Sequence, residues 1–366
     1  MGGEANLETI SLGGAVTDAS GRNLARWLFP LHGLVIFTGL QNVRYFFRPS
    51  IYMGYPLRIF SRPRSVVSEI TQVTFQHRSL IRPGLRLNPL IIGALAKAQA
   101  LYPLQLHGFI FLSTHFHIEA TFSDAQQMAR FMGHFTTNLS KIIGAEHDWK
   151  DSVFPKRYHH VELSEEPGVD LARLRYVTQN SCKENLVMSP LDWPGVSSAE
   201  ALITGEPLKG VWIDRTDFFR ARQRGEDVIE ADFTEHLELH LSPIPSLAHL
   251  SSRAYRDVMI DMIREIEEET LRRHRENGTV PLGVQAILSR RPDHRPSHTP
   301  SSPRPWFHAL SRKTRKAMRA ALTWIIVAYR DATDRLKAGE LDVEFPEGTF
   351  PPARPFVSFR KSLAPG

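Results

Sequence analysis

The chain has little cysteine and no long apolar run. Cys182 is the single cysteine among 366 residues, which excludes a disulfide framework and a zinc site built from several thiolates. The most apolar stretch, residues 24–40, is interrupted by Arg26 and Pro30 and lacks the composition of a membrane-spanning helix. The sequence begins Gly-rich and acidic rather than basic, unlike a secretory signal peptide. We therefore expect a reducing, cytoplasmic setting and no membrane partner.

Gly-rich phosphate loops and internal repeats are also missing, so no nucleotide cofactor is expected. Hydrophobic residues make up 42% of the chain and charged residues 23%, which is ordinary for a globular protein. The net charge of +6 permits a polyanionic partner without requiring one. At this length the chain can hold two modest domains, or one domain with long extensions.

Hydrophobic periodicity predicts an alternation of strands and helices in the first half of the chain. The expected strands are 66–76, 104–111, 115–122 and 154–163, and the expected helices are 88–102, 124–144 and 170–182. Their order is that of the ferredoxin-like split arrangement. The predicted fold class is α+β: an antiparallel sheet with helices on one face and the other face open.

A helical C-terminal extension is expected after this core. Its two long amphipathic helices are 252–275 and 312–337, and the second has a strongly basic start. Five prolines between Pro292 and Pro305 predict a linker or exposed strap. The predicted organisation is a leader (1–57), a core domain (58–200), a mixed and helical extension (201–291), a Pro-rich linker (292–305) and a basic helix with an extended tail (306–366). One hypothesis places the true start at Met53.

The sharpest motif is His115-Phe116-His117 within an expected strand. Alternation sends both imidazoles to one face and Phe116 to the opposite, buried face, so one metal ion could take both rings. Because the chain has 16 histidines, a His-x-His by chance is common and the pair alone does not establish a metal site. His236 and His240 in "HLELH" lack the Glu of a zinc hydrolase and are expected to be solvated.

Tyr176 and Asn180 are four residues apart and therefore share one face of the expected helix 170–182. A phenol with an ordinary pKa of about 10 attacks poorly, so a tyrosine nucleophile needs a nearby Lewis acid. A metal held by His115, His117 and the amide oxygen of Asn180 would supply that polarisation. The alternatives are that Tyr176 only packs its helix on the sheet and that Asn180 is a helix cap.

These residues resemble the HUH single-tyrosine transposases of the insertion-sequence-200-like group, and within it the REP-associated tyrosine transposases. The family's "LHAYVLMPN" before a His-hydrophobic-His strand corresponds to "LHGFIFLST" before "HFHIEATF". Its Arg-Tyr element corresponds to Arg157-Tyr158, and its "YIHLNPVRAGLV" and "PWSS" correspond to "YVTQNSCKENLV" and "DWPGVSS". The resemblance runs from about Ser61 to Ser198.

Three departures from the family pattern stand out. Ser113-Thr114 replaces the Pro-Asn before the histidines, which puts the shape of that loop in doubt. Thr178 replaces a His and Ser181 replaces a Pro, and both changes could weaken DNA contacts or activity. None of them removes a core catalytic group.

The resemblance implies that Tyr176 is the nucleophile and that His115, His117 and Asn180 hold Mg²⁺ or Mn²⁺. It implies cleavage and rejoining of single-stranded DNA: Tyr176 attacks a phosphodiester, forms a 5′-phosphotyrosine bond and releases a 3′-hydroxyl. The expected partner is single-stranded DNA at the hairpin ends of inverted repeats. Related enzymes work as dimers or as monomers, so a homodimer stays an open alternative.

Five residues near this core are candidates for DNA contact: Arg62, Arg64, Lys156, Arg157 and Tyr158. A charged edge strand is also a common protection against aggregation, so this prediction has a structural alternative. Besides the transposase, two other functions stay open. One is a domesticated protein that binds DNA hairpins without cleaving, and the other is a replication or conjugation initiator, less favoured because no helicase module is evident.

Overall fold

A computed structural model describes residues 59–62, 64–297, 305–340 and 342–352 of the chain. The predicted leader (1–57) and the hypothesis about Met53 lie outside these ranges, as do the centre of the Pro-rich linker and the end of the tail. Among the helices in the described ranges, none combines the length and apolarity that crossing a membrane requires.

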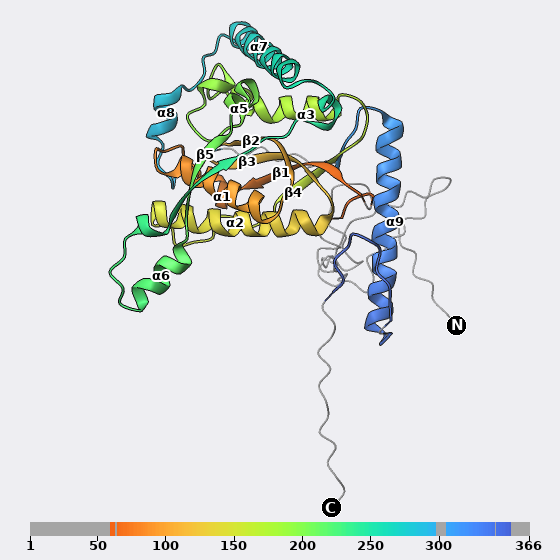
Figure 1. Cartoon of the computed structure of the whole chain (residues 1–366). Coiled ribbons are helices and arrows are strands. Elements are labelled where there is room, and N and C mark those ends of the chain that lie inside the picture. The colour runs from red at the N-terminus through yellow and green to blue at the C-terminus, as the bar shows by residue number, and fades with distance from the viewer. Residues whose placement is uncertain (1–58, 63, 298–304, 341, 353–366) are drawn as a thin grey trace, which may run out of the picture. The chain divides into compact units, whose positions relative to one another are not determined.

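The core follows the predicted order of strands and helices (Figure 1). Its elements are β1 (Val66–Val73), α1 (Leu87–Leu101), β2 (Gln105–Phe111), β3 (His115–Phe122), α2 (Ala125–His147) and β4 (His159–Leu163). The elements that follow are α3 (Val169–Thr178), α4 (Asn180–Lys183), α5 (Ala199–Thr204), β5 (Leu208–Ile213), α6 (Arg215–Gln223), β6 (Thr234–Leu239), α7 (Ser252–Asn277), α8 (Val284–Ser289), β7 (Phe307–His308) and α9 (Arg312–Lys337).

The main sheet has the strand order β2-β3-β1-β4-β7. β1 pairs antiparallel with β3 and β4, and β2 pairs antiparallel with β3, which is the ferredoxin-like arrangement. The short strand β7 adds to the free edge of β4 in parallel. The predicted α+β class and the helical C-terminal region are confirmed.

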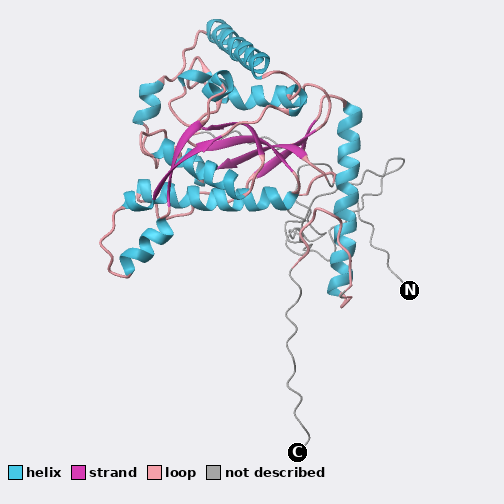
Figure 2. Cartoon of the chain, viewed as in Figure 1, coloured by secondary structure: helices cyan, strands magenta, loops and turns pink. Residues whose placement is uncertain are grey.

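Side-chain alternation along β3 separates two different faces of the sheet. Phe116, Ile118 and Phe122 point into the apolar core shared with α1 and α2. On the opposite face lie the two histidines of β3 and Glu119, and α3 packs there against β2 and β3. Figure 2 shows helices on both sides of the strands, with α7 beyond α3 and α5. The second face is therefore covered, and the expectation that it would be open was wrong.

Several predicted boundaries differ from the structure, three of them as follows. The strand expected at 154–163 pairs only from His159, because Pro155 has no N–H to give to a strand ladder. The strand expected at 66–76 ends at Val73, and a short 3-10 turn, Phe75–His77, follows it. The helix expected at 170–182 is divided, because Gln179 has ψ −1 and separates α3 from α4.

After residue 200 the chain forms a second sheet that the sequence pattern did not predict. Its strands β5 and β6 pair antiparallel, and β5 lies directly on α1. The contact is between backbones: a Cβ atom added to Gly93 would lie 2.0 Å from the carbonyl oxygen of Val211. His236 lies in β6 and His240 follows that strand, and both side chains are exposed, as expected.

We predict that Gly93→Ala destabilises the protein, because the added methyl group has no space between α1 and β5. The expected loss is about 2 kcal/mol in the free energy of unfolding, measured by urea denaturation. Gly133→Ala is the matched control, since nothing lies within 4 Å of its added Cβ atom and alanine stabilises an exposed helix by about 0.5–1 kcal/mol. Equal unfolding midpoints for Gly93→Ala and the wild type would contradict the close contact.

Candidate functional site

The two histidines of β3 stand side by side on the face covered by α3. The ring centroids of His115 and His117 are 5.1 Å apart, with the ring planes nearly perpendicular at 80°. His115 is half-buried and His117 is buried, whereas Phe116 between them lies in the opposite core. Thr114 Oγ1 lies 2.9 Å from His115 Nδ1. The pair thus sits at the boundary between the core and the surface.

α3 brings Tyr176 to this pair. Its ring centroid is 5.7 Å from that of His117, in an edge-on arrangement. Two cations flank the tyrosine ring: the guanidinium carbon of Arg173 lies 4.1 Å from its centroid and Nζ of Lys183 lies 4.4 Å from it. Such contacts hold the ring in place by cation–π attraction. Lys183 forms no ion pair with a carboxylate of the described residues, so it adds positive charge beside the phenol.

Glu69 of β1 contacts both His117 and Arg173. Its side chain is completely buried, and Oε1 lies 2.5 Å from His117 Nδ1. The guanidinium of Arg173 forms an ion pair with its other oxygen. Thr71 Oγ1 lies 3.0 Å from the same nitrogen of His117. One carboxylate therefore orients a histidine of the sheet and an arginine of the helix that carries Tyr176.

Asn180 is the first residue of α4, directly after the division of the helix. Its side chain is buried, and its Nδ2 has no hydrogen-bond partner within the described residues. Two neighbouring hydroxyls, Thr178 Oγ1 and Ser181 Oγ, are buried without partners in the same part of the chain. Each such group left without a hydrogen bond costs about 1–3 kcal/mol, so packing alone does not explain this cluster of polar side chains.

Two imidazoles side by side on one strand are a ligand type that divalent metal ions accept. A metal-ligating histidine usually gives its other ring nitrogen to a carboxylate, as His117 does to Glu69. His115 and His117, together with the carboxamide of Asn180, are the side chains that would hold such an ion, and Nδ1 of each ring already has a neighbour, Thr114 Oγ1 or Glu69 Oε1. Within the described ranges, no group of three His, Cys, Asp or Glu side chains is placed to hold a metal ion.

Comparisons with known proteins find similarity to a solved structure but no matching family model. No protein-family model matches the chain, and no curated protein matches it. Among solved structures, that of a REP-associated tyrosine transposase bound to a REP hairpin is similar to this chain at 14% sequence identity and a TM-score of 0.30. The match covers 50% of this chain and 90% of the other. No family assignment follows from a likeness of that size.

The residues that sequence reasoning missed are Glu69, Arg173 and Lys183. Glu69 stands inside an otherwise buried strand, and a lone charge in such a strand is a signal for a buried partner. Arg173 precedes Tyr176 by three residues, which places both on one face of a helix. Cys182 is a buried core residue as expected, and burial raises the pKa of its thiol to about 11.

The five candidates for DNA contact do not gather around Tyr176. Arg62 Nη1 lies 2.6 Å from Glu165 Oε1, and Arg64 Nη2 lies 2.9 Å from Oε2 of the same residue, so both charges are compensated. Lys156, Arg157 and Tyr158 line a hollow of about 330 Å³ together with residues of α2. That hollow lies on the sheet face opposite to the histidines, because it includes Gln72, which shares a face with Phe116.

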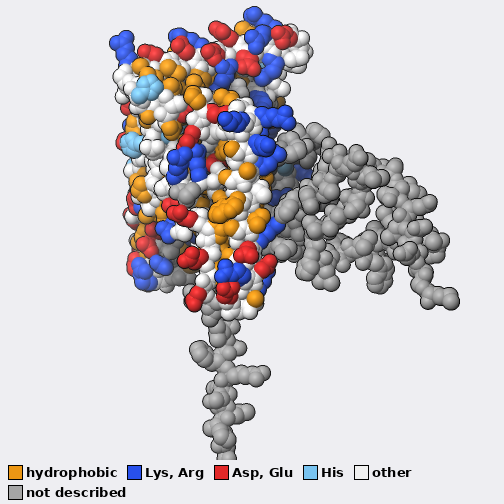
Figure 3. All heavy atoms as spheres, turned by 90° about the vertical axis from the view of Figure 1, so that its right-hand side faces the viewer, with side chains coloured by type: hydrophobic (Ala, Val, Ile, Leu, Met, Phe, Trp, Pro, Cys, Tyr) orange, Lys and Arg blue, Asp and Glu red, His pale blue; other side chains and the backbone are white. Residues whose placement is uncertain are grey.

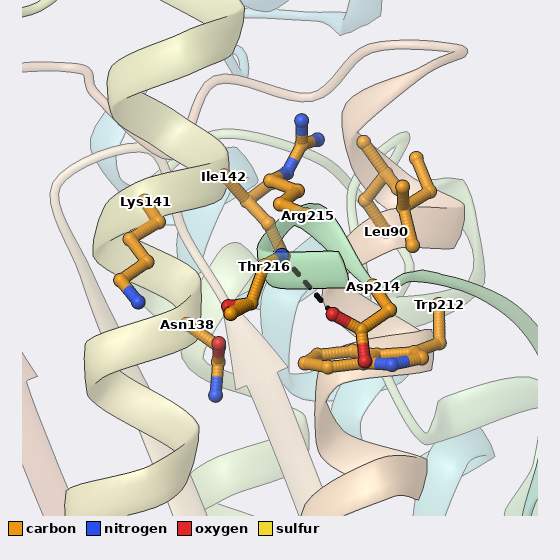
Figure 4. Close-up of a pocket in the computed structure, with 9 residues that line it drawn as sticks. Leu90, Asn138, Lys141, Ile142, Trp212, Asp214, Arg215 and Thr216 are labelled. Carbon is orange, nitrogen blue, oxygen red and sulfur yellow. Dashed lines mark hydrogen bonds between the residues drawn. The ribbon is translucent and has the colours of Figure 1, made fainter. Parts of the chain in front are cut away.

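A small cavity between α1, α2 and the start of α6 is drawn in Figure 4. Its volume is about 30 Å³, enough for a water molecule or two and not for a substrate. Asp214 and Thr216 meet there, where Oδ1 of Asp214 accepts a hydrogen bond of 3.0 Å from the Thr216 amide. The cavity therefore belongs to the cap of α6 and not to a reaction site.

We predict that Glu69→Gln destabilises the protein by about 3 kcal/mol, because Arg173 is left without its counter-charge in a buried position. Urea denaturation measures the loss. Glu165→Gln is the matched control: that carboxylate is 59% exposed, and exposed ion pairs contribute about 0–1 kcal/mol. A loss no larger for Glu69→Gln than for Glu165→Gln would contradict the connecting role of Glu69.

Glu119 gives a second prediction, on pH. Burial raises its pKa well above the usual range, with a smaller contribution from the charge of Asp170. The folded state then holds a proton that the unfolded state loses above its ordinary pKa of about 4.3, so stability falls as pH rises from there. We expect Glu119→Gln to remove up to about 1.4 kcal/mol of that loss per pH unit. If the free energy of unfolding depends on pH in the same way for the wild type and Glu119→Gln between pH 5 and pH 8, the raised pKa of Glu119 is contradicted.

Proposed function

We propose that this chain is a metal-dependent single-tyrosine transposase that cleaves and rejoins single-stranded DNA. The observation that carries the proposal is the convergence of three side chains from two separate elements. His115 and His117 of β3 are 5.1 Å apart between ring centroids, and Tyr176 of α3 is 5.7 Å from His117. The motifs that resemble HUH transposases contain the same three residues.

The reaction follows from a phenol next to a cation site. Oη of Tyr176 attacks a phosphodiester, a phosphorus–oxygen bond to tyrosine forms, and the bond to the 3′ oxygen breaks. The proton that the phenol loses is balanced by the proton that the leaving oxygen takes to become a 3′-hydroxyl, while the other strand end stays attached as a 5′-phosphotyrosine. Attack of a 3′-hydroxyl on this phosphotyrosine reverses the exchange, so no nucleotide is needed for rejoining.

Each neighbouring residue has a stated part in the proposal. Mg²⁺ or Mn²⁺ held by His115, His117 and Asn180 would polarise the phosphate and stabilise the developing charge. Arg173 fixes the tyrosine ring and is itself held by Glu69. Lys183 also lies over the ring and adds positive charge there. The proposed substrate is single-stranded DNA at the hairpin ends of inverted repeats.

We predict that Tyr176→Phe abolishes covalent attachment to DNA. Labelled single-stranded hairpins are incubated with the protein and Mn²⁺, and the products are separated on a denaturing gel. The wild type is expected to give a protein–DNA adduct and a shortened strand, and Tyr176→Phe to lower both at least about a hundredfold because the nucleophile is missing. Tyr102→Phe, at the end of α1, is the matched control and should retain both products.

Two further results would decide against the proposal. Equal scission by Tyr176→Phe and the wild type would show that another group attacks the phosphate. A wild-type protein that shifts the hairpin in a native gel but never attaches to it would be a binding protein, which is the alternative function. Removal of the metal by a chelator should stop attachment, and added Mn²⁺ should restore it in the wild type but not in His117→Ala.

A further inference from the structure

The first two turns of α9 carry an isolated group of cations. These residues, called here the α9 basic cluster, are Arg312, Lys313, Arg315, Lys316 and Arg319. The helix has no acidic residue before Asp331. In the part of the chain that the structure describes, none of the ion pairs to a carboxylate includes a member of the cluster. Within the described residues, no carboxylate therefore lies within ion-pair distance of any of these five side chains.

Helix stability does not account for this arrangement. The amino-terminal end of a helix is the positive end of its dipole, and each cation placed there costs about 0.3–1 kcal/mol. All five members lie within the first eight residues of α9. The cluster thus opposes folding of the helix that carries it. An external anion would compensate these charges.

A fixed contact holds the beginning of α9 beside the helix of Tyr176. Glu166, in the loop between β4 and α3, accepts hydrogen bonds from the Leu310 amide at 2.7 Å, from the Ser311 amide at 3.1 Å and from Thr314 Oγ1 at 2.8 Å. The hydroxyl of Ser311, with the other donors, lowers the pKa of Glu166 to about 2. The carboxylate is therefore ionised at any physiological pH, and the anchor persists until the pH falls towards that value.

His308 lies in β7, which pairs with the end of β4 directly before α9, so this strand joins the start of α9 to the sheet. Burial lowers the pKa of His308, and the charges of Arg173 and Arg315 lower it further. Arg173 lies over the ring of Tyr176, and Arg315 belongs to the α9 basic cluster. Figure 3 faces α9, and Lys and Arg side chains gather on the upper part of that face, at the level where α9 begins in Figure 1. The α9 basic cluster therefore lies close to the helix that carries Tyr176.

We propose that the α9 basic cluster binds the phosphodiester backbone of the single strand that leads to Tyr176. This inference rests on the proposed function, and it adds a binding surface outside the catalytic group. Lysine and arginine contacts to phosphates position the nucleic acid without reading its sequence. A positively charged path beside a reaction site also raises the local concentration of the strand. The α9 basic cluster thus supplies affinity for the single strand and orients it towards Tyr176, while cleavage depends on Tyr176 and the histidine pair.

The test uses Lys313→Gln/Lys316→Gln, since both side chains are exposed and the substitution keeps good helix formers. Affinity for a fluorescent single-stranded hairpin is measured by anisotropy at several NaCl concentrations. Each phosphate contact contributes about −0.7 to the slope of log affinity against log salt. We expect weaker binding and a slope less steep by about 1.4. Arg264→Gln/Arg272→Gln on α7 changes the net charge equally and should leave the slope unchanged.

The outcomes separate this inference from the proposed function. A slope unchanged by Lys313→Gln/Lys316→Gln, or an equal change in the α7 control, would overturn the role of the cluster. Preference for anionic lipid vesicles over DNA would also overturn it. If the wild type attaches to DNA and the salt slope of Lys313→Gln/Lys316→Gln is unchanged, the proposed transposase activity is supported and the role of the α9 basic cluster is contradicted. A reduced slope without any wild-type attachment would leave a DNA-binding surface on a protein that does not cleave.

Discussion

The position of the candidate nucleophile depends on one buried carboxylate. Glu69 has no exposed surface, so its charge has lost the hydration that an exposed carboxylate keeps. Arg173 and His117 replace that water, the first from α3 and the second from β3. Because both partners are needed, α3 cannot move away from the sheet without leaving a charge buried alone. The ion pair between Glu69 and Arg173 therefore maintains the distance between Tyr176 and the histidines.

Elements whose signal is local were predicted with good accuracy. The bounds of β3 agree to the residue because His115-Phe116-His117 continues a strict alternation, and α9 agrees because its apolar stripe and the cap at Ser311 are both local. The second sheet was missed because it depends on contact with another element. Gly93 and Gly210 allow the backbones of α1 and β5 to be in direct contact. The residue pattern within either segment does not predict that contact.

The same division applies to the candidate site. His115, His117 and Tyr176 could be found from motifs, since spacing and residue type are written in short segments. The role of Glu69 could not be found in this way, because Arg173 is 104 residues further along the chain. Its partners are decided by the pairing of β1 with β3 and by the packing of α3.

Whether a cation is available to DNA is likewise decided by tertiary structure and not by composition. Arg62 and Arg175 have the residue type of phosphate contacts, yet Glu165 and two acids of α7 compensate them in the fold. The beginning of α9 is the opposite case: Glu166 binds its amides and leaves its side-chain charges uncompensated. Glu166 therefore anchors the start of the helix without forming an ion pair with its lysine and arginine side chains. A polyanion that approaches Tyr176 would meet these cations with their charge intact, screened only by salt.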